Sequence, residues 1–238
     1  MNWFGKHISI MHGAYGCGLN DPMAYMGAHG WRYLRERLKF MWGRHLLKKE
    51  LNNNQLGNSL VVTERSVEIP LALDFLNSYV QDESVLELGC VLPYYILTPP
   101  QHVVYDLVDI HPANIKKDFR DLEIDDYKTN IISISTIEHI SNGDYGITQT
   151  SVTAINILCR IIENAKRYFV TFPLGHNHVL DEYVFANIEG CAFVTRMKED
   201  KNDWETVQNK AELTELQKSY GGYCHANTVC VVSNCLGA

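Results

Sequence analysis

The stretch Val85-Leu86-Glu87-Leu88-Gly89-Cys90 decides how the rest of this chain is interpreted. It is a short apolar run that ends in an acidic residue and a glycine. A second apolar run, from Val103 to Asp109, follows it and also ends in an acid. Such runs are typical of buried strands, and α/β sheets bind ligands beyond the carboxyl ends of their strands. The pair therefore predicts a ligand site at one edge of an α/β sheet.

Alternating strand and helix patterns continue to the end of the chain. Strands are expected at 85–88, 103–109, 130–135, 167–172, 191–195 and 228–232, and helices at 67–80, with Pro70 interrupting early, and 149–164. Alternation of this kind implies a mostly parallel sheet with helices on both faces. We therefore predict an α/β domain over residues 63–238, with a sheet of about seven strands.

Residues 1–62 have a different character and are expected to form an N-terminal helical segment. Within them, residues 31–50 carry apolar side chains at helical spacing, with seven basic residues and two acidic ones. A basic amphipathic helix can lie on an anionic membrane or receive an anionic substrate. The alternative is a helix packed on the domain with a solvated charged face. The segment is expected to cap the domain or to form the acceptor side of its site.

Composition restricts the class of protein. The chain has 238 residues, 46% of them hydrophobic and 21% charged, which favours a well-filled core over disorder. Its formal charge of -7 argues against a general nucleic-acid binder. The seven cysteines form no CxxC pair, which favours reduced thiols, and neither a signal-peptide pattern nor a bilayer-length apolar run is present. We expect a cytoplasmic protein, with the inner face of the membrane as a further location through the basic helix.

The residues at the predicted strand ends suit a nucleoside. Gly89 permits a tight turn and close approach of the backbone to a ligand, and Glu87 precedes that turn. Asp109 is placed to accept hydrogen bonds from both ribose hydroxyls. Asp118 and Phe119 would supply an acceptor for the amino group of adenine and an apolar wall for its ring.

The sequence has no phosphate-binding glycine loop, neither GxGxxG nor GxxxxGK[ST]. A nucleoside ligand without phosphates is therefore favoured over NAD or ATP. Among common cofactors, S-adenosylmethionine fits this description.

Four segments in order, VLELGC (85–90), LVDI (107–110), KDFRDL (117–122) and IISISTIEHI (131–140), resemble the motifs of class I S-adenosylmethionine-dependent methyltransferases. The segments ERSVEIP (64–70), SISTIEH (133–139) and TFPLGHN (171–177) are similar to the members encoded with bacterial capsule and O-antigen assembly enzymes. The resemblance covers about residues 64–205.

This resemblance implies a Rossmann-like fold and O-methylation of a sugar, or of another oxygen acceptor, in a bacterial surface polysaccharide or its precursor. The acceptor would be a small molecule or a glycan precursor. The implied S-adenosylmethionine-binding residues are Glu87, Gly89, Cys90, Asp109, Ile110, Asp118, Phe119 and Ser135.

The loop after the first strand departs from the family pattern. The family loop reads acid-x-Gly-x-Gly, whereas Cys90 and Val91 follow Gly89 here. Valine strongly disfavours a positive φ. The loop is therefore expected to take another path near the methionine part of the cofactor, fixed by Pro93.

Methyl transfer to a hydroxyl benefits from a base that takes up its proton. His139 follows the strand expected at 130–135, and a histidine pKa near neutrality suits that role. Glu138 is the second candidate, as base or as orienting group, and His176 is a third, with Asp181 in the same loop. A structural histidine that opens a helix is the alternative for His139.

No histidine or cysteine spacing reproduces a known metal motif, including those around His12, His29 and His45, so no metal site is predicted. Two alternatives to the surface-glycan enzyme are kept. One is a non-catalytic scaffold on the same fold. The other is a nucleic-acid methyltransferase, although Ser135 to Glu138 stand where such enzymes carry an Asn/Asp-Pro-Pro-Tyr segment, and no nucleic-acid partner is expected.

Overall fold

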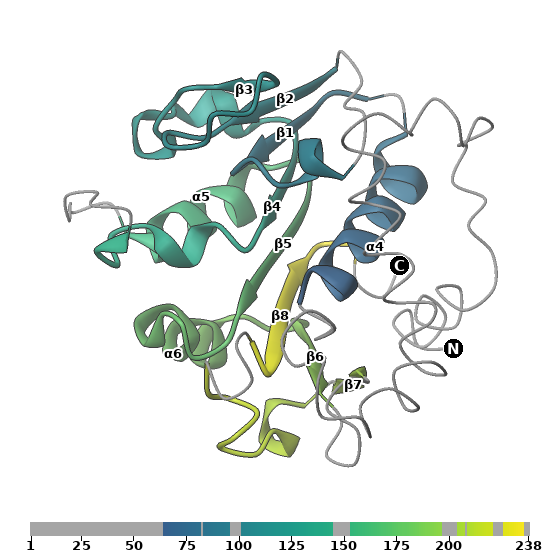
Figure 1. The fold of residues 1–238 in the computed structure, drawn as a ribbon, viewed down its shortest axis with the longest axis vertical. Helices are drawn as coiled ribbons and strands as arrows, with labels where there is room; N and C mark the ends of the chain where they lie inside the picture. The colour runs from purple at the N-terminus through teal and green to yellow at the C-terminus, as the bar shows by residue number, and fades with distance from the viewer. Residues whose placement is uncertain are drawn as a thin grey trace, which may run out of the picture.

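The computed structural model describes residues 64–81, 83–95, 101–144, 153–196, 204–207, 209–220 and 226–235. Within these ranges the chain forms one eight-stranded sheet with helices on both faces (Figure 1). The predicted α/β class and the mostly parallel sheet are confirmed. The N-terminal segment 1–62, its basic helix 31–50 and three of the histidines considered for metal binding lie outside the described residues.

The strands lie in the order β3-β2-β1-β4-β5-β8-β6-β7. The first five in this order are parallel to one another, whereas β8 is antiparallel to both of its neighbours and β7 is antiparallel to β6. Their bounds are β1 Val85–Leu88, β2 His102–Tyr105, β3 Asn114–Ile115, β4 Asn130–Ile134, β5 Arg167–Pro173, β6 Ala192–Arg196, β7 Trp204–Val207 and β8 Thr228–Ser233.

The strand order reverses next to β1. From β1 the chain passes to β2 and β3 on one side, and then crosses to β4 on the other side, so Leu86 pairs with both Val103 and Ile131. At such a reversal the connections leave in opposite directions and open a crevice beyond the carboxyl ends of the strands. The fold therefore places a ligand crevice where β1, β2 and β4 end.

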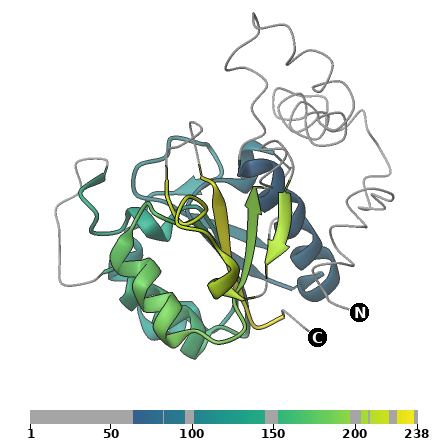
Figure 2. The ribbon, with the colours of Figure 1, turned by 90° about the horizontal axis from the view of Figure 1, so that it is seen from below.

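Helices cover the sheet unevenly. Helix α4 (Arg65–Phe75), continued by a π-helical turn at Leu76–Val80, packs on one face. Helices α5 (Ala154–Asn164) and α6 (His178–Asn187) pack on the other (Figure 2). Successive strand residues alternate between these layers, so Ile132 contacts the α4 core and Ile131 the α5–α6 core. Both faces are thus buried, as predicted.

The predicted end of the second strand is wrong. Strand β2 stops at Tyr105 rather than at Asp109, because Oδ1 of Asp106 accepts hydrogen bonds from the N–H groups of Val108 and Asp109 at 2.7 and 2.9 Å. This turn leaves the apolar side chains of Leu107 and Val108 exposed. Asp109 therefore lies in a loop, and Asp106 is the acid directly after β2.

Helix boundaries also differ from the prediction. Pro70 lies inside α4 and does not interrupt it. Helix α5 begins after Thr153, which caps it together with Asn156, whereas the prediction began at 149. Helix α6 and the short strands β3 and β7 were not predicted.

The described cysteines, Cys90, Cys159, Cys191, Cys230 and Cys235, are free thiols, as expected. No helix among the described residues combines the length and the apolar character needed to cross a bilayer.

Candidate functional site

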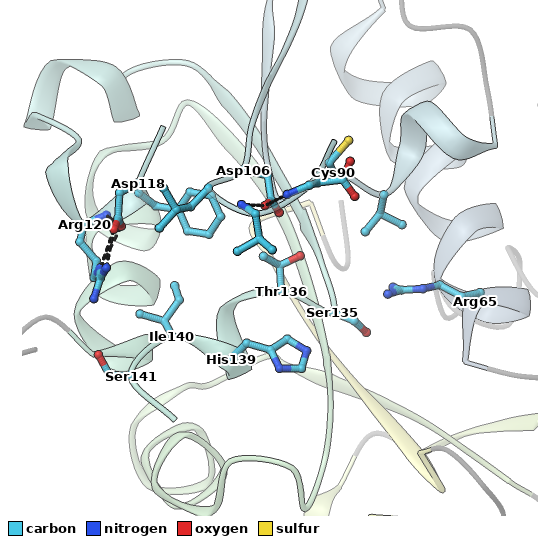
Figure 3. Close-up of a pocket in the computed structure, with 15 residues that line it drawn as sticks. Arg65, Cys90, Asp106, Asp118, Arg120, Ser135, Thr136, His139, Ile140 and Ser141 are labelled. Carbon is cyan, nitrogen blue, oxygen red and sulfur yellow. Dashed lines mark hydrogen bonds and ion pairs between the residues drawn. The ribbon is translucent and has the colours of Figure 1, made fainter. Parts of the chain in front are cut away.

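A pocket of about 280 Å³ lies at the carboxyl ends of β1, β2 and β4 (Figure 3). This volume is near the lower end of the range of small-molecule sites. The pocket is lined by Arg65, Cys90, Val91, Asp106, Leu107, Val108, Asp109, Asp118, Phe119, Arg120, Ser135, Thr136, His139, Ile140 and Ser141. It therefore occupies the crevice that the reversal of strand order creates.

The structure brings six predicted site residues together around this pocket: Cys90, Asp109, Asp118, Phe119, Ser135 and His139. Five others are not among its lining residues: Glu87, Gly89, Ile110, Glu138 and His176. Four of these five, all except Ile110, have contacts that are described below. Ile110 is 85% exposed at the outer end of the β2 loop.

Glu87 anchors the loop that follows β1. Its Oε1 accepts hydrogen bonds from the N–H groups of Val91 and Leu92, each at 2.8 Å, and its Oε2 lies 2.8 Å from Nε2 of His102. The side chain is completely buried. The loop thus continues as a 3-10 turn, Leu92–Tyr94, without a second glycine, and Glu87 as well as Pro93 fixes its path.

Gly89 permits a close approach between the ends of β1 and β4. Its φ is +94°, and a Cβ atom at this position would lie 2.1 Å from Oγ1 of Thr136. Glycine is therefore required by the packing of the pocket wall as well as by the backbone conformation.

The loop after β2 contributes two carboxylates. Both oxygens of Asp109 accept from the hydroxyl of Tyr94, at 2.9 and 3.0 Å, and Oδ1 also accepts from the N–H of His111. Asp106 uses only Oδ1 for its turn, and among the described residues its Oδ2 accepts no hydrogen bond. Asp106 is therefore better placed than Asp109 to bind a ligand hydroxyl, although both line the pocket.

Burial raises the pKa of the Cys90 thiol, and the nearby carboxylate of Asp109 adds to this effect. Cys90 therefore remains a neutral thiol and contributes shape rather than charge to the pocket.

A third acid, Asp118, lies across the pocket beyond β3. Asp118 accepts from the backbone N–H of Arg120 and forms an ion pair with its guanidinium group, which holds the pKa of Asp118 below its ordinary value. Phe119 lies between them in sequence and is 8% exposed. This wall offers an aromatic surface and a planar ion pair (Figure 3).

Ser135 is held beneath the pocket with a φ of +39°. Its hydroxyl donates to Oε1 of the buried Glu68 at 2.6 Å, and Thr171 donates to the same oxygen at 2.8 Å. Desolvation by burial raises the pKa of Glu68, although Arg65, 2.8 Å from its Oε2, acts in the opposite direction. The strained backbone at Ser135 is thus stabilised by a hydrogen-bonded network.

Arg65 extends from the start of α4 toward Ser135 and the centre of the pocket (Figure 3). Only its Nη1 takes part in the bonds to Glu68 and to the carbonyl of Ile134. Since a guanidinium group carries five N–H donors, its other nitrogens, which donate no hydrogen bond to the described residues, can donate to an anionic group in the pocket.

His139, at the end of the 3-10 turn Ile137–His139, joins two residues from outside the pocket wall. Its Nδ1 lies 2.8 Å from Oδ2 of Asp144, and its ring contacts that of His176 edge to face at 4.6 Å between centroids. Burial and the neighbouring His139 lower the pKa of His176. Burial opposes ionisation of Asp144, but the hydrogen bonds from His139 and Asn142 outweigh it and lower the pKa of Asp144.

Glu138 is 1% exposed, and neither of its carboxylate oxygens has a hydrogen-bond partner among the described residues. Its Oε1 lies 3.7 Å from Nε2 of His139. Desolvation raises the pKa of Glu138 well above its ordinary value. Glu138 therefore points toward the His139 ring from beneath and does not reach the pocket.

Asp181, a further acid considered from the sequence, lies in α6 away from the pocket. Its Oδ2 accepts from the N–H of Gly175 at 2.8 Å, and burial raises its pKa to about 6. It fixes the loop that carries His176.

Comparisons with protein-family models, with curated proteins and with solved structures found no match.

Three residues of the site were not selected from the sequence. Asp106 was missed because the apolar run continues past it to Asp109. Arg65 lies in a segment that resembles the family, but nothing in the sequence around it predicts that its side chain reaches the pocket. Asp144 belongs to no motif, and only the fold brings it to His139.

Proposed function

We propose that the pocket binds S-adenosylmethionine and that the protein transfers the methyl group to an oxygen acceptor. The observation that carries this proposal is the distribution of charge in one pocket at the strand-order reversal. Two carboxylates follow β2 and an arginine reaches the same pocket from α4. The sequence contains no phosphate-binding glycine motif. This arrangement suits a nucleoside whose tail carries an amino acid rather than phosphates.

The adenosine part is proposed to lie over the loop after β2. Oδ2 of Asp106 would accept hydrogen bonds from the ribose hydroxyls, and Asp109 would contribute from its fixed position beside Tyr94. Phe119 and the apolar side chain of Val108 would contact the adenine ring. Because Asp118 is paired with Arg120, it would accept the adenine amino group only with an oxygen that it already shares.

The amino-acid tail is proposed to extend toward α4. Arg65 would bind its carboxylate through the N–H groups that do not contact Glu68. The sulfonium carbon would then lie between the β1 loop and the turn after β4, where His139 borders the pocket.

Methyl transfer is an in-line displacement. The S–CH₃ bond breaks with its electron pair remaining on sulfur, the new O–CH₃ bond forms, and the acceptor hydroxyl loses its proton. The cluster formed by His139, Asp144 and His176 is proposed to promote that proton loss as one unit, because His139 borders the pocket and the ligand atoms of the three residues lie within 4.8 Å of one another. The protein's main contributions would be alignment and exclusion of water.

The finer parts of the proposal rest on the sequence resemblance. They are a Rossmann-like class I methyltransferase fold and an acceptor in a bacterial surface polysaccharide or its precursor. The strand order with its reversal at β1 supports the first of these. The proposed cytoplasmic location rests instead on the absence of a signal-peptide pattern, and the proposed membrane contact on the basic residues of 31–50.

Calorimetric titration with S-adenosylhomocysteine tests the proposal, with ATP and NAD as controls. Binding of S-adenosylhomocysteine alone is expected. Absence of binding up to millimolar concentrations would favour the non-catalytic scaffold, and preference for ATP or NAD would overturn the assignment of the pocket.

A further inference from the structure

We propose that His139, Asp144 and His176 form a binding site for a divalent transition-metal ion at the border of the pocket. These residues come from the turn after β4 and from the loop after β5, two neighbouring parallel strands whose carboxyl ends lie at the same edge of the sheet. The sequence predicted no metal site, because the two histidines lie far apart in the chain and no motif contains Asp144.

The distances suit a common ion. Oδ2 of Asp144 lies 2.8 Å from Nδ1 of His139 and 3.8 Å from Nε2 of His176, and one ligand atom from each residue lies within 4.8 Å of the others. Metal bonds of about 2.0–2.2 Å allow two ligand atoms to be at most about 4.4 Å apart. Small side-chain rotations are therefore sufficient to bring all three atoms onto one ion.

The surrounding hydrogen bonds hold the two loops together. The side-chain amide of Asn142 donates to Oδ2 of Asp144 and to the carbonyl oxygen of His176, each at 3.4 Å. The three ligand side chains are 25%, 33% and 16% exposed, in the order His139, Asp144, His176. An ion can therefore reach the site, and the site is largely shaped before the ion binds.

A second, independent observation points to the same ion. Glu138 is buried beneath the cluster, both of its carboxylate oxygens lack a hydrogen bond within the described part of the chain, and Oε1 faces Nε2 of His139 at 3.7 Å. Histidines that bind a metal through one ring nitrogen commonly donate the other N–H to a carboxylate. An ion on Nδ1 of His139 would place the proton on Nε2, where Glu138 can accept it. The metal thus accounts for the burial of this carboxylate beside the histidine.

The ligand set selects the class of ion. Two imidazoles and one carboxylate suit Zn²⁺, Fe²⁺ or Co²⁺ rather than Ca²⁺ or Mg²⁺, which prefer oxygen ligands. Three protein ligands leave coordination positions open. Because His139 lines the pocket, an open position would face it and would take an oxygen ligand such as a hydroxyl group.

The metal site stands independently of the proposed transferase activity, because it can be measured without cofactor. If both hold, the ion would bind the acceptor hydroxyl and lower its pKa, so that the proton passes to water; this last role rests on the proposed function.

The test uses the full chain, stripped with a chelator and titrated with Co²⁺, whose visible absorption reports bound ligands. His176→Ala and Asp144→Asn are each expected to remove one equivalent of Co²⁺ or to weaken its binding by more than about 100-fold. Glu138→Gln is expected to weaken it by about 10-fold or more. His178→Ala, an exposed histidine of α6, is the matched control and should leave binding unchanged.

Circular dichroism establishes whether each variant is folded. If His176→Ala does not fold, the conservative Asp144→Asn still allows the comparison. Unchanged stoichiometry and affinity in a folded ligand variant would overturn the metal site. Titration of the same metal-free samples with S-adenosylhomocysteine separates the two proposals. A variant that loses Co²⁺ binding but still binds S-adenosylhomocysteine supports the metal site without testing the cofactor site, and a wild type that binds Co²⁺ but not S-adenosylhomocysteine contradicts the proposed function alone.

Discussion

Oε2 of Glu87 lies 2.8 Å from Nε2 of His102, and both side chains are buried between the neighbouring strands β1 and β2. The other oxygen of Glu87 accepts from two backbone amides of the β1 loop. Both oxygens of Glu87 therefore contact other parts of the protein and not the pocket. These contacts shape the loop that forms one wall of the pocket.

Glu87→Ala is expected to lower the free energy of unfolding by about 2–5 kcal/mol, because it leaves two backbone amides of the β1 loop without their acceptor and empties the buried space beside His102. Glu87→Gln keeps an acceptor for the amides and should cost less, about 1–2 kcal/mol. Urea unfolding monitored by circular dichroism measures both. Equal, small effects would show that the loop does not depend on this anchor.

Gly89→Ala should destabilise the protein by about 2–5 kcal/mol, from a positive φ and from the contact with Thr136. Gly190→Ala is the matched control, since Gly190 also has a positive φ but nothing within 4 Å of the added Cβ. The double variant Gly89→Ala/Thr136→Ala should recover part of the loss. If Gly89→Ala and Gly190→Ala lower the free energy of unfolding equally, the added Cβ at position 89 does not clash with Thr136.

Stability should depend on pH through Asp181, whose pKa burial raises from 3.8 to about 6. Between these values the folded state binds the proton more tightly than the unfolded state, so the free energy of unfolding falls as pH rises from about 4 to about 6. The full effect is up to about 3 kcal/mol. Asp181→Asn keeps an acceptor for Gly175 and removes the ionisation.

Urea unfolding of the wild type and Asp181→Asn at about pH 4.5 and about pH 7.5, on either side of the raised pKa, checks this prediction. The wild type should lose more stability than the variant between the two pH values. Other buried carboxyls, such as Glu68 and Glu138, are present in both the wild type and the variant, so their effects on stability cancel in the comparison. Parallel pH profiles would contradict the raised pKa.

Arg65→Met should weaken S-adenosylhomocysteine binding by about 10-fold, because a charge-assisted hydrogen bond to its carboxylate is lost. 5′-Methylthioadenosine has no carboxylate and should bind the variant and the wild type equally. The ratio of the two affinities within each protein corrects for any general loosening of the Glu68 network, and Arg65→Lys should keep an intermediate ratio. An unchanged ratio would remove Arg65 from the proposed site.

The sequence was sufficient to predict the strands that are buried on both faces. β1, β4 and β5 appear as apolar runs with clear limits, and their observed bounds agree with the prediction to within one residue. The end of β2 could not be predicted from hydrophobicity, because Leu107 and Val108 are apolar but exposed. Its limit is set by a hydrogen-bonded turn at Asp106.

The candidate site was predicted less completely than the sheet. Residues directly after strands, such as Cys90 and Ser135, could be placed at one edge because parallel strands end together. Side-chain pairing could not be predicted, so Glu87 was assigned to the cofactor although it binds the loop. The approach of Asp144 and His176 to His139 depends on how two loops fold, and no local pattern encodes it.

Whether the pocket binds the cofactor through the acid after β2 can be measured by calorimetric titration of the wild type and of Asp106→Asn with S-adenosylhomocysteine. The side-chain carbonyl of the introduced asparagine would still accept the two backbone hydrogen bonds of the turn, so the fold should be kept while the negative charge is lost. The account predicts one ligand per wild-type chain and binding weakened by about 10–100-fold in Asp106→Asn, as expected for about 1–3 kcal/mol. Asp109→Asn should weaken binding and also lower stability through Tyr94. Equal affinity of the wild type and Asp106→Asn, or no binding by the wild type, would contradict the account.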